Sequence, residues 1–220
     1  MTTERRVVQL TAAGIKEAGS VLSRAFYDDP LMTYIFPDDA RRARLLQWYM
    51  SVWVRYGCDY GEVDTSEGDV RGVVVWFPPD TFQMDLARMM RTGIILLPVK
   101  LGLPAFGRFM RAANFLEGLH SRSVTARHVY LLFLGADPPY QGQGIGGSLL
   151  QSLVARADRE RLPCYLETAE GGNLPFYRAH GFEVAAEGEV PGGGPHFWTM
   201  IRRVAGSEPL TSRPPQPRPA

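Results

Sequence analysis

A glycine-rich run directly after an apolar stretch is the feature that most constrains this chain. "RHVYLLFLGAD", residues 127–137, predicts a buried strand, and "PPYQGQGIGGSLL", residues 138–150, follows it. Helical spacing of apolar residues begins at Gly144 and continues to Arg159. Glycines at a strand-to-helix turn let the backbone approach a phosphate, and the amides and dipole of the helix N-terminus attract its charge. The run therefore predicts a phosphate site.

The glycine pattern is compatible with two classes of ligand. Gly142, Gly144 and Gly147 satisfy the G-x-G-x-x-G pattern of dinucleotide folds, with Glu167 in place of the acidic residue on the next strand. In such folds the strand enters the first glycine directly, whereas "DPPYQ" intervenes here. Gln141, Gly144 and Gly146 instead form Q-x-x-G-x-G, which suits a pyrophosphate on helix amides. A tight turn without a ligand is the plainer alternative.

Composition sets limits on the class of protein. The chain has 220 residues, 45% of them hydrophobic, which suits one α/β domain with a sizeable core. A net charge of +1 without like-charge runs argues against nucleic acid and anionic membranes as partners. Cys58 and Cys164 stand alone, so neither a disulfide framework nor a zinc site is expected. We expect a cytoplasmic protein, monomeric or homodimeric, without a metal.

The remaining segments predict a mixed fold. "RRVVQL" predicts a first strand, Thr11 an N-cap for a helix to about Ala25, and "YDDPLMTYIFPDD" a loop. A helix is expected from about Ala40 to Tyr56, then a hairpin of "GCDYGEVD" and "RGVVVWFP". Residues 80–122 predict two or three short helices broken by glycine and proline. "PCYLET" predicts a strand, "NLPFYRAHGF" a short helix, and "FEVAAEGEV" with "HFWTMIRR" a second hairpin. The proline-rich residues 206–220 predict a disordered tail.

"LGADPPYQGQGIGGSLL" followed by "NLPFYRAHGF" resembles the GCN5-related N-acetyltransferases, and residues 162–200 look particularly like the puromycin N-acetyltransferases of that family. The resemblance implies an α/β (α+β) fold with a mostly antiparallel sheet of about seven strands, splayed between the fourth and fifth. Residues 1–205 would form one domain, with 80–122 as an insertion before the fourth strand. It also implies acetyl-CoA as cosubstrate, held by Leu134, Gly135, Ala136, Gln141, Gly142, Gln143, Gly144, Ile145, Gly146, Gly147, Ser148 and Asn173.

Acetyl transfer to an amine needs an oxyanion donor, a base and an acid. The amides of Leu134 and Ala136 are candidates for the donor, unless they pair within the sheet. Tyr177 is the candidate acid for the departing thiolate, its alternative being a core tyrosine, although Phe176 is expected to be the core residue. Asn173 caps the same helix and is also expected to touch the pantetheine arm.

The base and the acceptor are less constrained. Glu167, at the end of its strand, is the candidate base, with a solvated or salt-bridged glutamate as the alternative. The weaker candidates are Asp28, Asp29 and Glu170, and the four histidines are scattered along the chain. Trp48, Tyr49 and Trp53 suit either the core or an apolar acceptor pocket.

We expect acetyl transfer to a small-molecule amine by direct attack in a ternary complex. The alternatives are a non-catalytic acyl-CoA sensor, a lysine acetyltransferase acting on proteins, and, disfavoured by "DPPYQ", a dinucleotide-dependent oxidoreductase.

Overall fold

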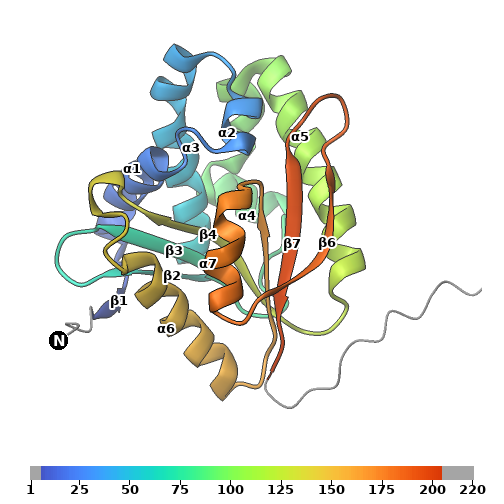
Figure 1. The fold of residues 1–220 in the computed structure, drawn as a ribbon. Helices are drawn as coiled ribbons and strands as arrows, with labels where there is room; N and C mark the ends of the chain where they lie inside the picture. Colours follow the sequence, from blue (N-terminus) through green and yellow to red (C-terminus); the bar gives the residue numbers. More distant parts are fainter. Residues whose placement is uncertain (1–5, 205–220) are drawn as a thin grey trace, which may run out of the picture.

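A seven-stranded sheet organises the chain in a computed structural model that describes residues 6–204 (Figure 1). The strand order is β1-β2-β3-β4-β5-β7-β6. The first four are β1 (Val7–Gln9), β2 (Glu62–Ser66), β3 (Gly72–Phe77) and β4 (Val129–Ala136). The others are β5 (Cys164–Thr168), β6 (Glu183–Glu189) and β7 (His196–Arg202). Neighbouring strands are antiparallel except β4 and β5, which run parallel, so the expected mixed and mostly antiparallel sheet is confirmed.

Helices cover both faces of this sheet (Figure 1). On one side lie α1 (Ile15–Ala25) and α3 (Asp39–Tyr60), and on the other α6 (Ile145–Arg159) and α7 (Leu174–Ala179). The short α2 (Pro30–Ile35) and the insertion α4 (Leu86–Thr92) and α5 (Leu97–Ser123) complete the fold. Four 3-10 turns, η1 (Ala12–Gly14), η2 (Ile94–Leu96), η3 (Pro138–Tyr140) and η4 (Gly171–Asn173), link these elements.

Strand alternation produces two cores. Val73, Val75 and Phe77 of β3 pack with α1 and α3, whereas Val74 and Trp76 face α6. All six β3 residues are therefore buried, as expected for a strand covered on both faces. A third, smaller cluster joins α5 to the β6–β7 hairpin and contains Ala112, Leu119, Val190 and Phe197.

Two predicted boundaries are wrong for identifiable reasons. "PLMTYI", expected as loop, forms α2, because the Asp29 carboxylate accepts the N–H groups of Leu31 and Met32 and Pro30 starts the helix. The helix α3 continues through "GCDY", which was assigned to a strand. The insertion is broken at glycines, as expected: Gly93 ends α4, and Gly102 (φ 65°, ψ 161°) separates two helical segments within α5, the second of which continues through Pro104 to Ser123.

Within the described residues, no single helix is long and apolar enough to cross a membrane. Taken together, Leu86–Thr92 and Ile94–Ser123 have the length and apolar composition of a membrane span, but the two helices are bent by 85° relative to each other. The tail expected to be disordered, residues 206–220, lies outside the described residues.

Candidate functional site

The glycine run forms an open turn at the start of α6. Gly142 and Gly144 adopt φ of 72° and 82°, the left-handed region that favours glycine. A Cβ added at either position would meet no atom within 4 Å, so the backbone there is accessible. Gly144 is the N-cap of α6, and the following amides begin the helix without intrahelical acceptors. The turn has the accessible, left-handed geometry that the predicted phosphate site requires.

Side-chain contacts hold this turn in place. Asp137, buried at the end of β4, accepts two hydrogen bonds of 2.7 Å from Arg24 of α1. The Gln141 side chain donates to the carbonyl oxygen of Ala136 at 3.1 Å. A bidentate arginine–carboxylate pair is geometrically specific, so α1 fixes the position at which the chain leaves the sheet. Gln141 thus braces the turn through its side-chain N–H.

The strands β4 and β5 separate before β4 ends. Their pairing covers Val129, Tyr130 and Leu131 of β4, while β3 follows β4 as far as Ala136. A register shift between β3 and β4 leaves Leu132 as the extra residue, and such bulges bend the strand that carries them. The edge of β4 from Leu132 onward therefore faces a gap, which is the splay expected from the resemblance. Gly135 within it also lets α1 approach, because an added Cβ would lie 3.0 Å from Ala25 and Leu22.

A cavity of about 530 Å³ opens at this splay. Its lining includes Leu132, Phe133 and Leu134 of β4, and Glu167, Thr168 and Ala169 at the end of β5. Asn173 and Tyr177 contribute from the far side of the sheet. The rest is mostly apolar and comes from α2, α3 and the insertion, including Met32, Tyr49, Trp53, Phe82, Ile94, Phe106 and Phe109. The cavity thus combines an unpaired strand edge with a predominantly apolar chamber.

Tyr177 is buried and unpaired in this cavity. Its side chain is 7% exposed, and among residues 6–204 its hydroxyl has no hydrogen-bond partner. Burial, and then the charge of Asp29, raise the pKa of Tyr177 above its ordinary value, so the phenol is protonated at neutral pH. Phe176, expected to be the more buried of the two, is half-buried and lies beside Gly146 and His180. The hydroxyl of Tyr177 is thus available to a molecule in the cavity.

Glu167 accepts hydrogen bonds from two tyrosines. Tyr165 donates to Oε1 and Tyr130 donates to Oε2, both at 2.8 Å. Burial raises the pKa of the Glu167 carboxyl to about 7, the two hydrogen bonds oppose the rise, and the charge of Glu117 adds to it. A carboxyl that titrates near neutral pH can both take and release a proton there. Within residues 6–204 Glu167 makes no ion pair, and tyrosine hydroxyls hold both of its carboxylate oxygens.

Asp29 is a second carboxylate on the cavity wall. Burial raises its pKa to about 6, opposed by the hydrogen bonds from Met32 and Leu31. Of the other candidates, Asp28 is exposed, and Glu170 is exposed and accepts the Gly172 N–H in η4. Asn173 stands at the N-cap of α7 as expected, but its side chain makes no capping hydrogen bond.

Sequence reasoning missed a histidine pair beside the site. His120 of α5 and His128 before β4 bring their Nε2 atoms to 2.7 Å, and His120 stacks on Tyr165 with ring centroids 4.2 Å apart. Burial lowers the pKa of His120 to about 4, and His128 contributes to the fall. His120, Glu117 and Tyr130 line both the cavity and a neighbouring pocket of about 360 Å³. Only folding brings these residues together, because the scattered histidines form no motif along the chain.

Residues 104–182 match the acetyltransferase (GNAT) family, and a Corynebacterium glutamicum protein described as a histone acetyltransferase HPA2 and related acetyltransferase shares the fold. Residues 104–182 thus carry the GNAT family match, and the chain as a whole has the GNAT fold. The bacterial GNAT structure superposes with a TM-score of 0.66 at 21% identity, covering 94% of this chain and 98% of its own.

Two further relatives carry related names. An uncharacterized N-acetyltransferase of Schizosaccharomyces pombe is 26% identical over 79% of this chain and 72% of its own length. A Drosophila melanogaster polyamine N-acetyltransferase, described as forming N-acetylagmatine, has a TM-score of 0.62 at 15% identity, covering 90% of this chain and 99% of its own.

GNAT acetyltransferases use acetyl-CoA as cosubstrate. Two features fit such a molecule. The open turn at Gly142 and Gly144 can bind a pyrophosphate, and the unpaired edge of β4 can bind an extended pantetheine arm. Within the described residues, no group of three or more His, Cys, Asp or Glu side chains could hold a metal ion.

Proposed function

We propose that this GNAT protein transfers the acetyl group of acetyl-CoA to the primary amine of a small, partly apolar molecule. One observation carries the proposal: the cavity at the β4–β5 splay contains both a neutral tyrosine without a partner and a carboxyl that titrates near pH 7. An acyl-CoA sensor has no need of such a pair.

The cosubstrate would lie across the sheet edge. The amides at Gly144–Gly147 would hold the pyrophosphate, and the edge of β4 from Leu132 to Ala136 would align the pantetheine arm toward the cavity. Leu134 lines the cavity, so its amide is the better placed of the two candidates to donate to the carbonyl oxygen. Asn173, at the N-cap of α7, lines the same cavity.

In the reaction, the amine nitrogen attacks the thioester carbonyl carbon and the carbon–sulfur bond breaks. Glu167 takes the proton that the amine loses, directly or through water, and the Tyr177 hydroxyl gives its proton to the departing thiolate. Tyr130 and Tyr165 orient Glu167 through their hydrogen bonds. Direct attack needs no covalent enzyme intermediate, so both substrates must occupy the site together.

The acceptor is inferred from the chamber walls. Aromatic and aliphatic side chains from α2, α3 and the insertion suit an aromatic or aliphatic body, and Asp29, Glu117 and Glu167 suit an amine at its end. A bulk protein tail would need an open acidic groove, which this predominantly apolar chamber does not resemble.

Release of free thiol from acetyl-CoA, measured with a panel of acceptors, tests the assignment. The panel contains aromatic amines, aminonucleosides, polyamines, aminoglycosides and lysine peptides. We expect amine-dependent thiol release with aromatic or aminonucleoside-like amines. Activity confined to lysine peptides would replace the small-molecule assignment with a protein acetyltransferase. Binding of CoA without any turnover would favour the sensor.

A further inference from the structure

The insertion presents large apolar side chains to solvent. Leu86 and Met90 of α4 are each 63% exposed, and Val99 and Leu103 of α5 are each 81% exposed. Leu86 and Met90 are four residues apart and so lie on one side of α4. We define the apolar corner as the exposed side chains at the α4–α5 junction, namely Met84, Leu86, Met90, Ile95, Leu96, Val99 and Leu103. Such a grouping of apolar side chains on a solvent-exposed surface marks an interaction site.

The same segment carries a net positive charge between Asp85, which pairs with Arg88, and Glu117. Between Leu86 and Leu116 the chain has no Asp or Glu and five cations, Arg88, Arg91, Lys100, Arg108 and Arg111. Arg91, Lys100 and Arg111 are exposed; Arg91 lies 3.8 Å from the Asp59 carboxylate, Lys100 lies over the Trp48 ring, and Arg111 donates to the Tyr34 hydroxyl. The net charge of +1 over the whole chain hides this local excess. Apolar side chains together with Lys and Arg are the composition of segments that lie at an anionic lipid surface.

The shape of the segment suits lying on a membrane and not crossing it. The two helices meet at Gly93, whose φ of 86° allows a turn of 85° between them. Neither helix alone meets the length and hydropathy needed for a span. A bent, exposed and cationic corner can insert its apolar side chains to the depth of the headgroups while the rest of the protein stays in water.

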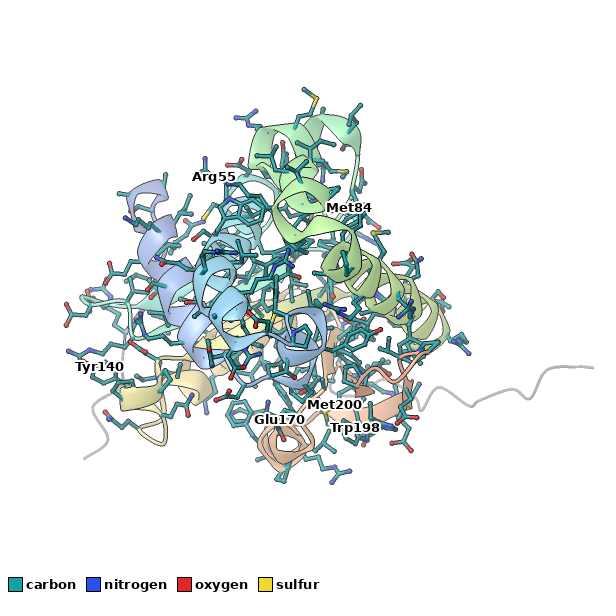
Figure 2. The ribbon with its side chains drawn as sticks, turned by 90° about the horizontal axis from the view of Figure 1, so that it is seen from above. Arg55, Met84, Tyr140, Glu170, Trp198 and Met200 are labelled. Atoms are coloured by element: carbon teal, nitrogen blue, oxygen red, sulfur yellow. The ribbon has the colours of Figure 1, made fainter. Side chains whose placement is uncertain are left out.

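The apolar corner is continuous with the rim of the cavity. Met84 and Ile95 are exposed, at 42% and 40%, and also line the cavity, as does Met110 further along α5. In Figure 2, Met84 and Arg55 lie at the side of the molecule that carries the helical insertion, whereas Tyr140, before the glycine turn, lies at the opposite side. A surface docked on the corner would thus meet the cavity rim and leave the glycine turn open to water.

We propose that the apolar corner docks this protein on an anionic lipid bilayer, with the cavity rim at the interface. The apolar side chains enter the headgroup region, and the exposed cations pair with lipid phosphates. An amphipathic amine dissolved in the bilayer then reaches the chamber without crossing water, while the charged cosubstrate arrives from the aqueous side. This last step rests on the proposed function, but the docking does not.

Vesicle flotation tests the docking without reference to activity. The full chain is mixed with vesicles of phosphatidylcholine alone, or of phosphatidylcholine and phosphatidylglycerol in equal parts. We expect binding to the mixed vesicles, weakened by high salt, and at least tenfold weaker binding to phosphatidylcholine. Arg91→Gln or Lys100→Gln should each reduce binding about fivefold, the effect of removing one cation near the surface.

Two variants locate the surface. Val99→Glu with Leu103→Glu places carboxylates on the corner and should abolish flotation, whereas Val184→Glu, at an exposed apolar position on the edge strand β6, should leave it intact. Acetylation of a water-soluble amine without vesicles should be the same in all three proteins, which checks folding and tests the proposed function separately.

Failure of the native chain to float with the mixed vesicles would overturn the proposal, and so would native flotation of the double variant. If the native chain does not float but forms a dimer, and the double variant is a monomer, the apolar corner is the interface with a second copy of this chain.

Discussion

The Tyr130 hydroxyl lies 2.8 Å from the Oε2 atom of Glu167 and joins the two strands that separate at the site. Tyr130 belongs to the paired part of β4, one residue before the last pair with β5, and Glu167 follows the last paired residue of β5. The hydrogen bond therefore closes the inner end of the splay. It also fixes the candidate base at the point where the exposed edge of β4 begins.

The first prediction concerns the acid. Tyr177→Phe should lower kcat about a hundredfold and change KM for acetyl-CoA little, because the lost proton transfer acts in the transition state. Steady-state kinetics measures both constants. Tyr60→Phe, on the last turn of α3, is the matched control and should behave as the native protein. Native turnover of Tyr177→Phe would make Tyr177 a structural residue.

The second prediction concerns the pH dependence of catalysis. With Glu167 as base, kcat/KM for an uncharged aromatic amine should rise about tenfold per pH unit and level off above about pH 7, where the carboxyl is ionised. Glu167→Gln should lose this slope and show its largest relative defect above pH 7. Rate profiles between pH 5 and 9 test this. The same slope in the variant would remove Glu167 as the base.

The third prediction concerns stability and uses the same carboxyl. Its folded pKa of about 7 lies above the value of 4.5 for a free glutamate, so the folded protein binds the proton more tightly. Stability of the native chain therefore falls as pH rises from about 4.5 to about 7, by up to about 3 kcal/mol from this group. The amide of Glu167→Gln does not titrate, so the variant does not lose this stability. The free energy of unfolding of the variant minus that of the native chain should therefore increase between about pH 4.5 and pH 7. Urea unfolding at pH 5 and pH 8 measures the difference, and a gap independent of pH would contradict it.

The fourth prediction concerns the phosphate site. Gly146→Glu should weaken CoA binding at least tenfold, because a carboxylate would stand beside the amides that are meant to hold a pyrophosphate. The fold should survive, since a Cβ at Gly146 meets only Phe176, at 3.8 Å, and acidic residues suit the first turn of a helix. Gly146→Ala is the control, because it also replaces the glycine but adds no charge. Calorimetric titration with CoA measures the affinity, and equal affinity in both variants would place the phosphate elsewhere.

The fifth prediction concerns acceptor size. Ala113 of α5 lines the cavity, and Ala113→Phe should fill part of it. We expect kcat/KM for a bulky aromatic amine to fall about tenfold or more, while that for ethylamine changes little. Competition between the two amines in one reaction gives the ratio directly. An unchanged ratio would mean that the acceptor binds outside this chamber.

Local patterns predicted the parts of the site that depend on local geometry. The glycine turn, the strand before it and the helix after it follow from backbone requirements within residues 129–159, and the structure confirms these elements. Glu167 and Tyr177 were found at positions marked by the resemblance, and the cavity brings them together. Whether they act as base and acid stays a prediction.

Other parts depend on contacts between distant segments and left no local signal. Tyr130 stands in an apolar strand, and only the pairing of β4 with β5 shows that its hydroxyl meets Glu167. His120 and His128 come together across the end of α5. Gly102 does break the insertion as the sequence indicated, but the second helical segment of α5 continues through Pro104 to Ser123, where it packs on α2, α3 and the β6–β7 hairpin. The charge of the insertion was missed because its five cations are spaced along 31 residues and form no run of like charges.

The most direct test is the mass of the amine after incubation with isotopically labelled acetyl-CoA and the full-length protein. The account predicts an aromatic or aminonucleoside-like primary amine that gains one labelled acetyl group, with one free CoA released per product molecule and with product formation strongly reduced in Tyr177→Phe. It would be contradicted if CoA bound at the glycine turn but no amine in the panel gained the label.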